Sequence, residues 1–246
     1  MSLFSFQGKV MLAERTAQGK AVKFTWLGNV PTLQLQLQTN NVTKNESYTG
    51  NRLQIGMLAG SKTANLNLTA DEWTAQSIAL ALYATNLDIA GSTVTGEALP
   101  SPLAVGDLVR LEHGFISDLV LDDAGTPLVL GTDYSIYSES AGIIEMLTAQ
   151  ADPIEADYEY AAVQAATIFT EQPPERWLML DGINTDNNEP VLLDLYKVRF
   201  NPVGDLSLIT DEYGNIPLTA SVLYDPLNAG DANLGGFGRV RNKAAV

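Results

Sequence analysis

Cysteine is absent from this 246-residue chain, and histidine occurs only once. Without cysteine the chain forms no disulfide and offers no thiolate nucleophile, so its stability must come from packing and association. Zinc is usually held by several cysteines or histidines, which this sequence does not supply. We therefore predict no metal site and no cofactor.

Basic residues are also scarce: 14 Lys and Arg stand against 29 Asp and Glu, for a net charge of -15. A strongly acidic chain repels phosphate, which argues against tight binding of nucleic acids or of anionic membranes. No apolar run approaches the roughly 20 residues of a membrane-spanning helix, and the N-terminus lacks the apolar core of a signal peptide. We expect a protein that folds in a cytoplasm, with no membrane insertion.

Catalytic motifs are missing as well. His113 would need a serine nucleophile, but no G-x-S-x-G elbow is present, so we expect His113 in a turn or on the surface. Composition leaves a glycosidase-like carboxylate pair open, although the spacing singles out none. Asp181–Asp186 fails as a calcium loop because its glycine is second, and Gly235–Gly238 has no P-loop lysine. We predict no catalytic residue and no enzymatic activity.

What the chain does contain is a series of short strand patterns. The clearest is Thr32–Gln38, in which leucine and glutamine alternate strictly. Side chains of a strand point alternately to its two faces, so the leucines share one face and the glutamines share the other. The uncharged polar face consists of Gln34, Gln36 and Gln38.

A long polar connector, Thr39–Gly50, separates this strand from the strand-like segment Arg52–Leu58. Two strands around such a connector predict an extended hairpin whose tip projects from the body of the domain. Long ordered loops often bind partners, and a hairpin that is merely solvated is equally compatible with the sequence.

One helix is predicted, over Thr69 to about Thr85. Thr69 and Glu72 fit a capping box at its start, where acidic residues also suit the helix dipole. Apolar residues occur along two of its faces, which indicates burial on both sides or a core helix within one subunit.

Further strands are predicted by apolar runs between turn signals. They cover residues 107–111, 119–121, 135–137, 143–146, 158–160, 177–180, 192–200, 206–209 and 216–224. The last of these is expected to be an ordered closing strand. The basic end of the chain, residues 238–246, is expected to be mobile.

Charge is distributed unevenly along the chain. Residues 97–175 contain fifteen acids and one Arg, whereas residues 1–52 contain six bases and two acids. Such asymmetry suggests complementary contacts between subunits, and a solvated acidic face explains it equally well.

Two stretches carry a resemblance to a known family. The first is Phe4–Met57, with short strands, the Leu/Gln strand and the polar loop that contains Glu46–Gly50. The second is Leu128–Tyr137, which includes Gly-Thr-Asp-Tyr and leads on to Tyr158–Ala161. Together they resemble the major tail tube proteins of long-tailed (siphovirus-type) bacteriophages. The likeness covers most of the chain, through diffuse motifs.

The resemblance implies a mainly β fold: a tail-tube-type β-sandwich or barrel with a long projecting hairpin and one helix, Asp71–Ala84, that flanks the barrel on its outside. Minimal tube proteins are shorter than this chain. We therefore expect an inserted acidic β subdomain at residues 99–162, between the two parts of the tail-tube domain at 1–98 and 163–246.

The resemblance also implies a function and partners. Tail tube proteins form hexameric rings that stack into a tube, through which the genome leaves the virion. The implied partners are further copies of the chain, the tape measure, terminator and distal tail proteins, and DNA that passes without being held. The implied location is the virion tail, assembled in the cytoplasm of a bacterial host.

Two groups of residues receive roles from this resemblance. Candidates for the lumen-facing wall are Gln34, Gln36 and Gln38, which are also compatible with the solvent side of the flanking helix. Candidates for the loop that reaches the adjacent ring are Asn41, Val42, Thr43, Lys44, Asn45, Glu46, Ser47, Tyr48 and Thr49.

Two other classes of protein stay open. Another virion component, such as a tail terminator, a baseplate hub or a decoration protein, would also use a β fold. A carbohydrate-binding β-sandwich would need aromatic side chains on one exposed face. Trp26, Trp73 and Trp177 lie in separate predicted elements, which indicates no such platform.

Overall fold

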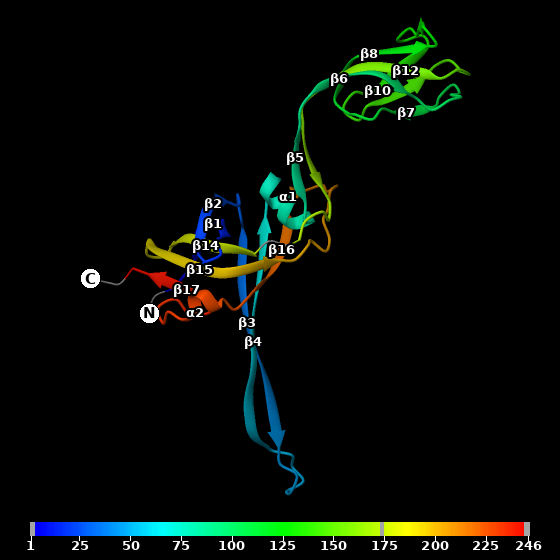
Figure 1. Cartoon of the computed structure of the whole chain (residues 1–246). Helices are drawn as coiled ribbons and strands as arrows, with labels where there is room; N and C mark the ends of the chain where they lie inside the picture. The colour runs from blue at the N-terminus through cyan, green and yellow to red at the C-terminus, as the bar shows by residue number, and fades with distance from the viewer. Residues whose placement is uncertain (1–2, 173–174, 244–246) are drawn as a thin grey trace. The chain divides into compact units, whose positions relative to one another are not determined.

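The computed structural model describes residues 3–172 and 175–243, and its fold is mainly β (Figure 1). Strands make up 54% of the structure and helices 5%, which confirms the mainly β class. The chain divides into two compact units, the first formed by Met1–Asn86 with Ala166–Val246 and the second by Leu87–Ala165. The predicted insert at 99–162 lies within the second unit.

The chain passes between the two units through β5 (Thr85–Ile89) and β13 (Val163–Thr167), which pair with each other. The second unit therefore begins earlier than the predicted insert, and it includes β6 (Ser92–Ala98). Two helices, α1 (Ala75–Leu82) and α2 (Pro226–Ala229), belong to the first unit. Among the described residues, no helix has the length and apolar character that a membrane span requires.

The first unit is built on one antiparallel sheet with the strand order β2-β1-β14-β15-β16-β4-β3, and β17 pairs with β15 beside this path. Its strands are β1 (Phe6–Arg15), β2 (Ala21–Trp26), β3 (Thr32–Asn45), β4 (Gln54–Ala70), β14 (Glu175–Asn184), β15 (Glu189–Phe200), β16 (Ile216–Val222) and β17 (Gly238–Asn242). β15 pairs with β17 through Val191–Leu195 but with β16 only through Val198–Phe200. The sheet therefore folds over at β15 into two layers of a sandwich. One layer contains β2, β1, β14, β15 and β17, and the other contains the end of β15 with β16, β4 and β3.

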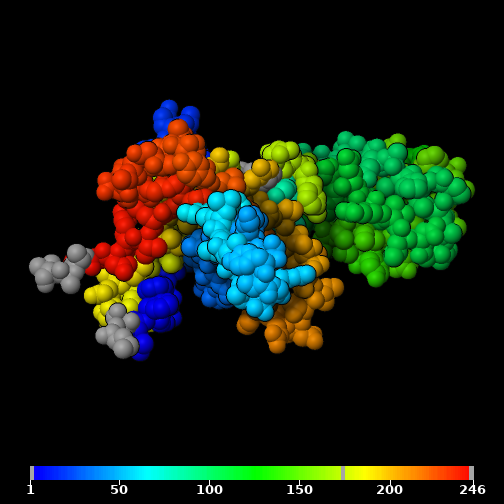
Figure 2. Space-filling model, turned by 90° about the horizontal axis from the view of Figure 1, so that it is seen from below, coloured from blue at the N-terminus to red at the C-terminus, as the bar shows by residue number. Residues whose placement is uncertain are grey.

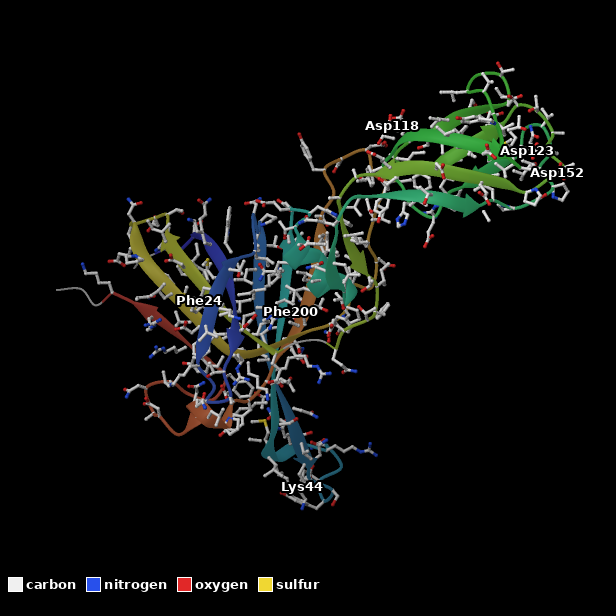
Figure 3. All side chains as sticks on the ribbon, turned by 45° about the horizontal axis from the view of Figure 1, so that its top comes forward. Phe24, Lys44, Asp118, Asp123, Asp152 and Phe200 are labelled. Atoms are coloured by element: carbon white, nitrogen blue, oxygen red, sulfur yellow. The ribbon has the colours of Figure 1, made fainter. Side chains whose placement is uncertain are left out.

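The core of the first unit lies between these layers. Val10, Leu12 and Leu178 come from one layer and pack in the same cluster as Leu66 and Leu218 from the other. Helix α1 adds Leu80 and Ala81 to this cluster, so it covers part of the apolar side of the layer that contains β16, β4 and β3. Phe200, labelled in Figure 3, joins the same core from the end of β15.

The predicted start of the helix was wrong. Thr69 and Ala70 belong to β4, where they pair with Pro217 and Ile216 of β16. Sheet hydrogen bonding therefore extends through the segment in which a helix was predicted to begin. A local capping pattern cannot compete with a strand that continues in the sheet.

The helix instead begins after Thr74. The Ser77 backbone N–H donates to Thr74 Oγ1 at 3.1 Å, and the Thr74 N–H donates to Ser77 Oγ at 2.9 Å. This reciprocal pair is the capping box that the structure contains. Glu72, predicted to cap, accepts a hydrogen bond from the Asn29 backbone N–H at 3.0 Å and so fixes the loop before β3.

Two other predictions were also wrong. Leu206–Ile209 is not a strand but part of the loop between β15 and β16. Residues 238–242, predicted to be mobile, form β17 on the edge of β15. Arg239 and Arg241 of this strand donate to the buried Asp194 carboxylate, at 3.4 and 2.8 Å, which fixes its position. Residues 244–246 of the same predicted tail lie outside the described residues.

The second unit consists of a four-stranded sheet, β6-β12-β8-β9, and a three-stranded sheet, β10-β11-β7. Its other strands are β7 (Leu108–Arg110), β8 (Ile116–Asp123), β9 (Thr126–Pro127), β10 (Tyr134–Ser138), β11 (Ile143–Met146) and β12 (Ile154–Tyr160). Leu121, Ile144, Met146 and Ile154 are fully buried in a core of its own. The unit also carries fourteen acids and a single Arg.

We expect two leucines of β4 to differ sharply in their contribution to stability. Leu66 is 0% exposed and Leu58 is 70% exposed. Leu66→Ala leaves a cavity in the core and should lower the free energy of unfolding by about 2–5 kcal/mol. Leu58→Ala should change it by less than about 0.5 kcal/mol. Urea denaturation of both variants measures the difference, and equal effects would contradict this core assignment.

Candidate assembly surface

The β3–β4 hairpin extends beyond the sandwich as a two-stranded ribbon. β16 pairs with β4 only through Ala64–Ala70, whereas β3 and β4 remain paired to Asn45 and Gln54. In Figure 1 this ribbon runs downward from the first unit, and Figure 2 looks onto its light-blue tip, which is uncovered on the viewer's side. Lys44 is labelled near its end in Figure 3.

The ribbon exposes apolar side chains on both faces. Val42 and Leu58 form a cross-strand pair on one face, and Met57, the neighbour of Leu58, points to the opposite face. All three are more than half exposed, as is Ile55 nearer the tip. A two-stranded ribbon alone in water is marginally stable, and apolar groups uncovered on both sides are typical of surfaces that bind a partner.

The tip itself is organised around Glu46. Glu46 is 4% exposed, and its carboxylate accepts hydrogen bonds from the Tyr48 and Thr49 backbone N–H groups at 2.9 and 2.8 Å. The Thr49 hydroxyl and the Leu53 N–H also donate to it. The residues that enclose Glu46 are those of the tip, so one side chain closes the loop of residues 46–53.

These hydrogen bonds determine the ionisation of Glu46. The Thr49 side chain, the Thr49 backbone and the other donors stabilise the carboxylate, and they lower its pKa from 4.5 to about 2. Glu46 is therefore charged at neutral pH and serves as a structural anion. Tyr48, 80% exposed, is presented outward by the loop that Glu46 holds.

A bulge marks the point where the ribbon leaves the sandwich. The register shifts between Thr39↔Lys62 and Asn41↔Ala59, so β4 contains one extra residue there. A Cβ atom on Gly60 would lie 1.8 Å from the Asn40 carbonyl oxygen, which explains why glycine occupies this close approach. Bulges bend a strand and increase its twist, so this one sets the direction of the ribbon.

The nine predicted loop residues lie partly in β3 and partly in the tip loop. Asn41, Val42, Thr43, Lys44 and Asn45 were predicted within a connector but belong to β3, paired with β4. Glu46, Ser47, Tyr48 and Thr49 form the tip loop. Val42 and Thr43 are β-branched, which was the signal that the strand continues.

The three predicted lumen residues share one exposed face. Gln34, Gln36 and Gln38 pair with Asn67, Asn65 and Thr63 of β4, and Thr219 and Ser221 of β16 continue the rows. This uncharged polar face lies opposite the apolar side, which α1 covers. The glutamines therefore do not face the helix.

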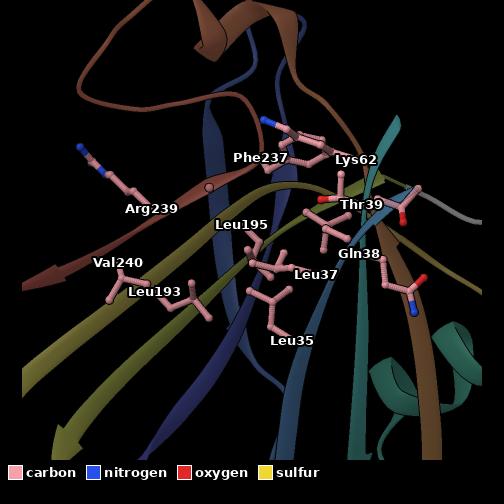
Figure 4. A pocket seen from close by; sticks show the side chains of 14 residues that line it. Leu35, Leu37, Gln38, Thr39, Lys62, Leu193, Leu195, Phe237, Arg239 and Val240 are labelled. Atoms are coloured by element: carbon pink, nitrogen blue, oxygen red, sulfur yellow. The ribbon is translucent and has the colours of Figure 1, made fainter. Parts of the chain in front are cut away.

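The outer edge of β3 carries no neighbouring strand in the part of the chain that the structure describes. Beside this edge a groove of about 430 Å³ opens between the two layers. Figure 4 shows Leu35 and Leu37 of β3 near Leu193 and Leu195 of β15, with Val240 of β17 at the rim. Sequence reasoning missed this groove because it brings together strands far apart along the chain.

The single histidine and the Gly-Thr-Asp-Tyr segment make contacts within the second unit. The His113 imidazole stacks on Tyr160, with ring centroids 3.9 Å apart. The Asp133 carboxylate of the Gly-Thr-Asp-Tyr segment accepts a hydrogen bond from the Val129 N–H at 2.9 Å, and the buried Tyr134 hydroxyl donates to the Leu119 carbonyl at 3.1 Å. Within residues 3–172 and 175–243, no three His, Cys, Asp or Glu side chains form a group suited to a metal ion.

The tryptophans do not share one face. Trp26 lies on β2, Trp73 precedes α1, and both are about half exposed or more. Trp177 is buried in β14, packs at a tilt against Tyr196 and donates its Nε1–H to Asp194 at 3.3 Å. One of the three is therefore a core residue rather than part of a sugar-binding surface.

We expect the order of the tip to depend on pH only in strong acid. Because the folded pKa of Glu46, about 2, lies below its ordinary value of 4.5, the carboxylate stabilises the tip fully above pH 4.5. This contribution falls as the pH drops from 4.5 towards 2. The amide NMR shifts of Tyr48, Thr49 and Leu53, measured as a function of pH, report this loss of order.

Glu46→Gln is the matched variant, because glutamine keeps the size but loses the charge. In this variant the tip amides should show the chemical shifts of a disordered loop already at neutral pH, while the amide shifts of the sandwich remain unchanged. A Glu46 carboxyl that titrates near its ordinary pKa in the wild-type chain would contradict this account of the tip.

Comparison with known protein families gives a match over most of the chain. A family model, described as "Protein of unknown function UCP028589", matches residues 3–241. The match therefore includes both units and the hairpin. No curated protein matches the chain.

Proposed function

We propose that this chain, which belongs to the UCP028589 family, is the structural subunit of a phage tail tube and assembles with copies of itself into stacked rings. In this proposal the rings are hexameric, and their lumen conducts the genome during ejection. The observation that carries the proposal is the edge of β3, which pairs with no strand among the described residues and is continued by a ribbon with two uncovered apolar faces.

The β3 edge lacks the usual protection of an edge strand. Natural edge strands are kept from pairing by short length, charged side chains, proline or bulges. β3 is 14 residues long and has no proline. Its one charge, Lys44, and both register shifts with β4 lie beyond Thr39, so the stretch Thr32–Thr39 has neither a charge nor a bulge. Ring closure would account for such an unprotected edge, because a neighbouring copy would supply hydrogen-bond partners for its backbone.

The polar face suits the inner wall of a tube. Gln34, Gln36 and Gln38 present amides, which bring no positive charge to hold phosphate. DNA would therefore pass such a wall without being retained. A net charge of -15 on each chain adds weak repulsion of the genome.

The two apolar faces of the ribbon support a contact along the tube axis. A ribbon that enters the adjacent ring would bury Val42 and Leu58 on one face and Met57 on the other. Repetition of such a heterologous contact builds an open filament. Within the virion tail, the tape measure, terminator and distal tail proteins would be the other partners.

The direct test is electron microscopy of the purified chain at increasing concentration. The proposal expects rings and hollow tubes. A chain that remains monomeric at every concentration contradicts it. High copy number in a purified virion would separate a tube subunit from a terminator, hub or decoration protein.

Removal of the ribbon should block stacking and leave the subunit folded. Asn41 and Ala59 face each other across the strands, so an Asn-Gly turn can replace residues 42–58. We expect single rings without tubes in micrographs, with a thermal unfolding midpoint close to that of the wild type. Tubes of normal length from this variant would contradict the role of the ribbon.

A charge on the β3 edge should block ring closure instead. Leu37 is 73% exposed, so Leu37→Lys should cost little stability in the monomer, but it places an ammonium group at the edge that must pair. We expect a folded monomer in sedimentation velocity. Leu37→Thr, which introduces a β-branched but uncharged side chain suited to a strand, is the control and should still form rings.

A further inference from the structure

The loop between β15 and β16 resembles the hairpin in its exposure and opposes it in charge. Residues 201–215 contain three acids, Asp205, Asp211 and Glu212, and no basic residue. Ile209 is 98% exposed, and Leu208 and Tyr213 are also exposed. Three uncovered apolar side chains beside three carboxylates form a surface of the kind that partners cover.

The loop is attached to the sandwich at its beginning. The Asn201 N–H donates to the Thr219 carbonyl at 2.8 Å, and the Val203 N–H donates to the Ala81 carbonyl at 2.8 Å. Val203 and Leu206 pack against the core. The segment from Ser207 to Asn215 then extends into solvent from a fixed base.

The loop and the hairpin tip lie at opposite ends of the first unit. β4 begins at the tip with Gln54 and ends at Ala70, which pairs with Ile216, the residue that follows the loop. The length of β4 therefore separates the two, as Figure 1 shows for the hairpin and the orange segment before β16. Head-to-tail stacking of two copies brings the tip of one to the loop of the next.

The charges at these two ends are complementary. Residues 40–62 contain Lys44, Arg52 and Lys62 and one acid, Glu46, whose carboxylate is taken up by hydrogen bonds within the tip. Neither Lys44 nor Arg52 forms an ion pair within the described residues, and both are exposed. The basic tip and the acidic loop have opposite charges, and both expose apolar side chains that a contact between them would cover.

We infer that the hairpin tip of one copy docks on the 204–214 loop of the next copy along the tube axis. Lys44 and Arg52 face Asp211 and Glu212 in this contact, while Tyr48 and Leu53 cover Ile209 and Tyr213. The inference rests on the proposed function and names the receiving surface for its axial contact.

A charge-swap experiment tests this contact. The tip-reversal variant carries Lys44→Glu and Arg52→Glu, and the loop-reversal variant carries Asp211→Lys and Glu212→Lys. Each alone sets like charges against each other, so the concentration at which tubes form should rise about tenfold. The chain with all four substitutions should form tubes within about threefold of the wild-type concentration.

The control places the same reversal elsewhere. Tip reversal combined with Glu139→Lys and Glu159→Lys, two exposed acids of the second unit, should stay as defective as tip reversal alone. Rescue by this control would place the receiving surface on the second unit and overturn the inference. Thermal unfolding of all variants verifies that the exposed substitutions leave the fold intact.

The outcomes separate this inference from the proposal on which it rests. If the wild type forms tubes and the four-substitution chain remains as defective as either parent, the loop is not the receiver and the tube proposal stands. If the wild type forms no tubes at any concentration, both fail.

Discussion

The backbone of β3 imposes the constraint on which the rest of the first unit depends. A strand whose second edge is free leaves N–H and C=O groups without protein partners, and such an edge pairs readily with another strand. In this chain the edge is 14 residues long and nearly uncharged, and it lies beside an apolar groove between the layers. In the proposed ring, a neighbouring copy would supply partners for these groups.

A long edge of this kind requires control of when and how it pairs. The net charge of -15 makes copies of the chain repel one another at long range, which in the proposed assembly would delay pairing until two copies are in contact. Nearly half of the acids lie in the second unit, which has its own core and folds around it. The first unit keeps an uncharged face at Gln34, Gln36 and Gln38. In the proposed assembly, the second unit would thus supply much of the repulsion between copies, and the first unit would supply the pairing edge.

The proposed axial contact also requires a ribbon that stays ordered in water before it is covered. Glu46 closes the tip by accepting hydrogen bonds from four donors, and the bulge at Gly60 directs the ribbon at its base. A preorganised tip loses less conformational entropy when it binds. The apolar side chains between these two points are then free to serve an interface rather than the stability of the subunit.

The sequence by itself determined the features that depend on local pattern. Alternation of leucine and glutamine predicted β3 and its two faces, and the polar connector predicted the projecting hairpin, because side-chain direction in a strand follows from its period of two. The tertiary structure alone decided the start of α1 after Thr74, the loop in place of a strand at 206–209, and the strand β17. Two of these depend on a distant partner: β16 extends β4 through Ala70, and Asp194 holds Arg239 and Arg241 of β17. The groove arises in the same way, since long-range pairing brings β3 and β17 to one side of the sandwich, and no local pattern records which strands will meet.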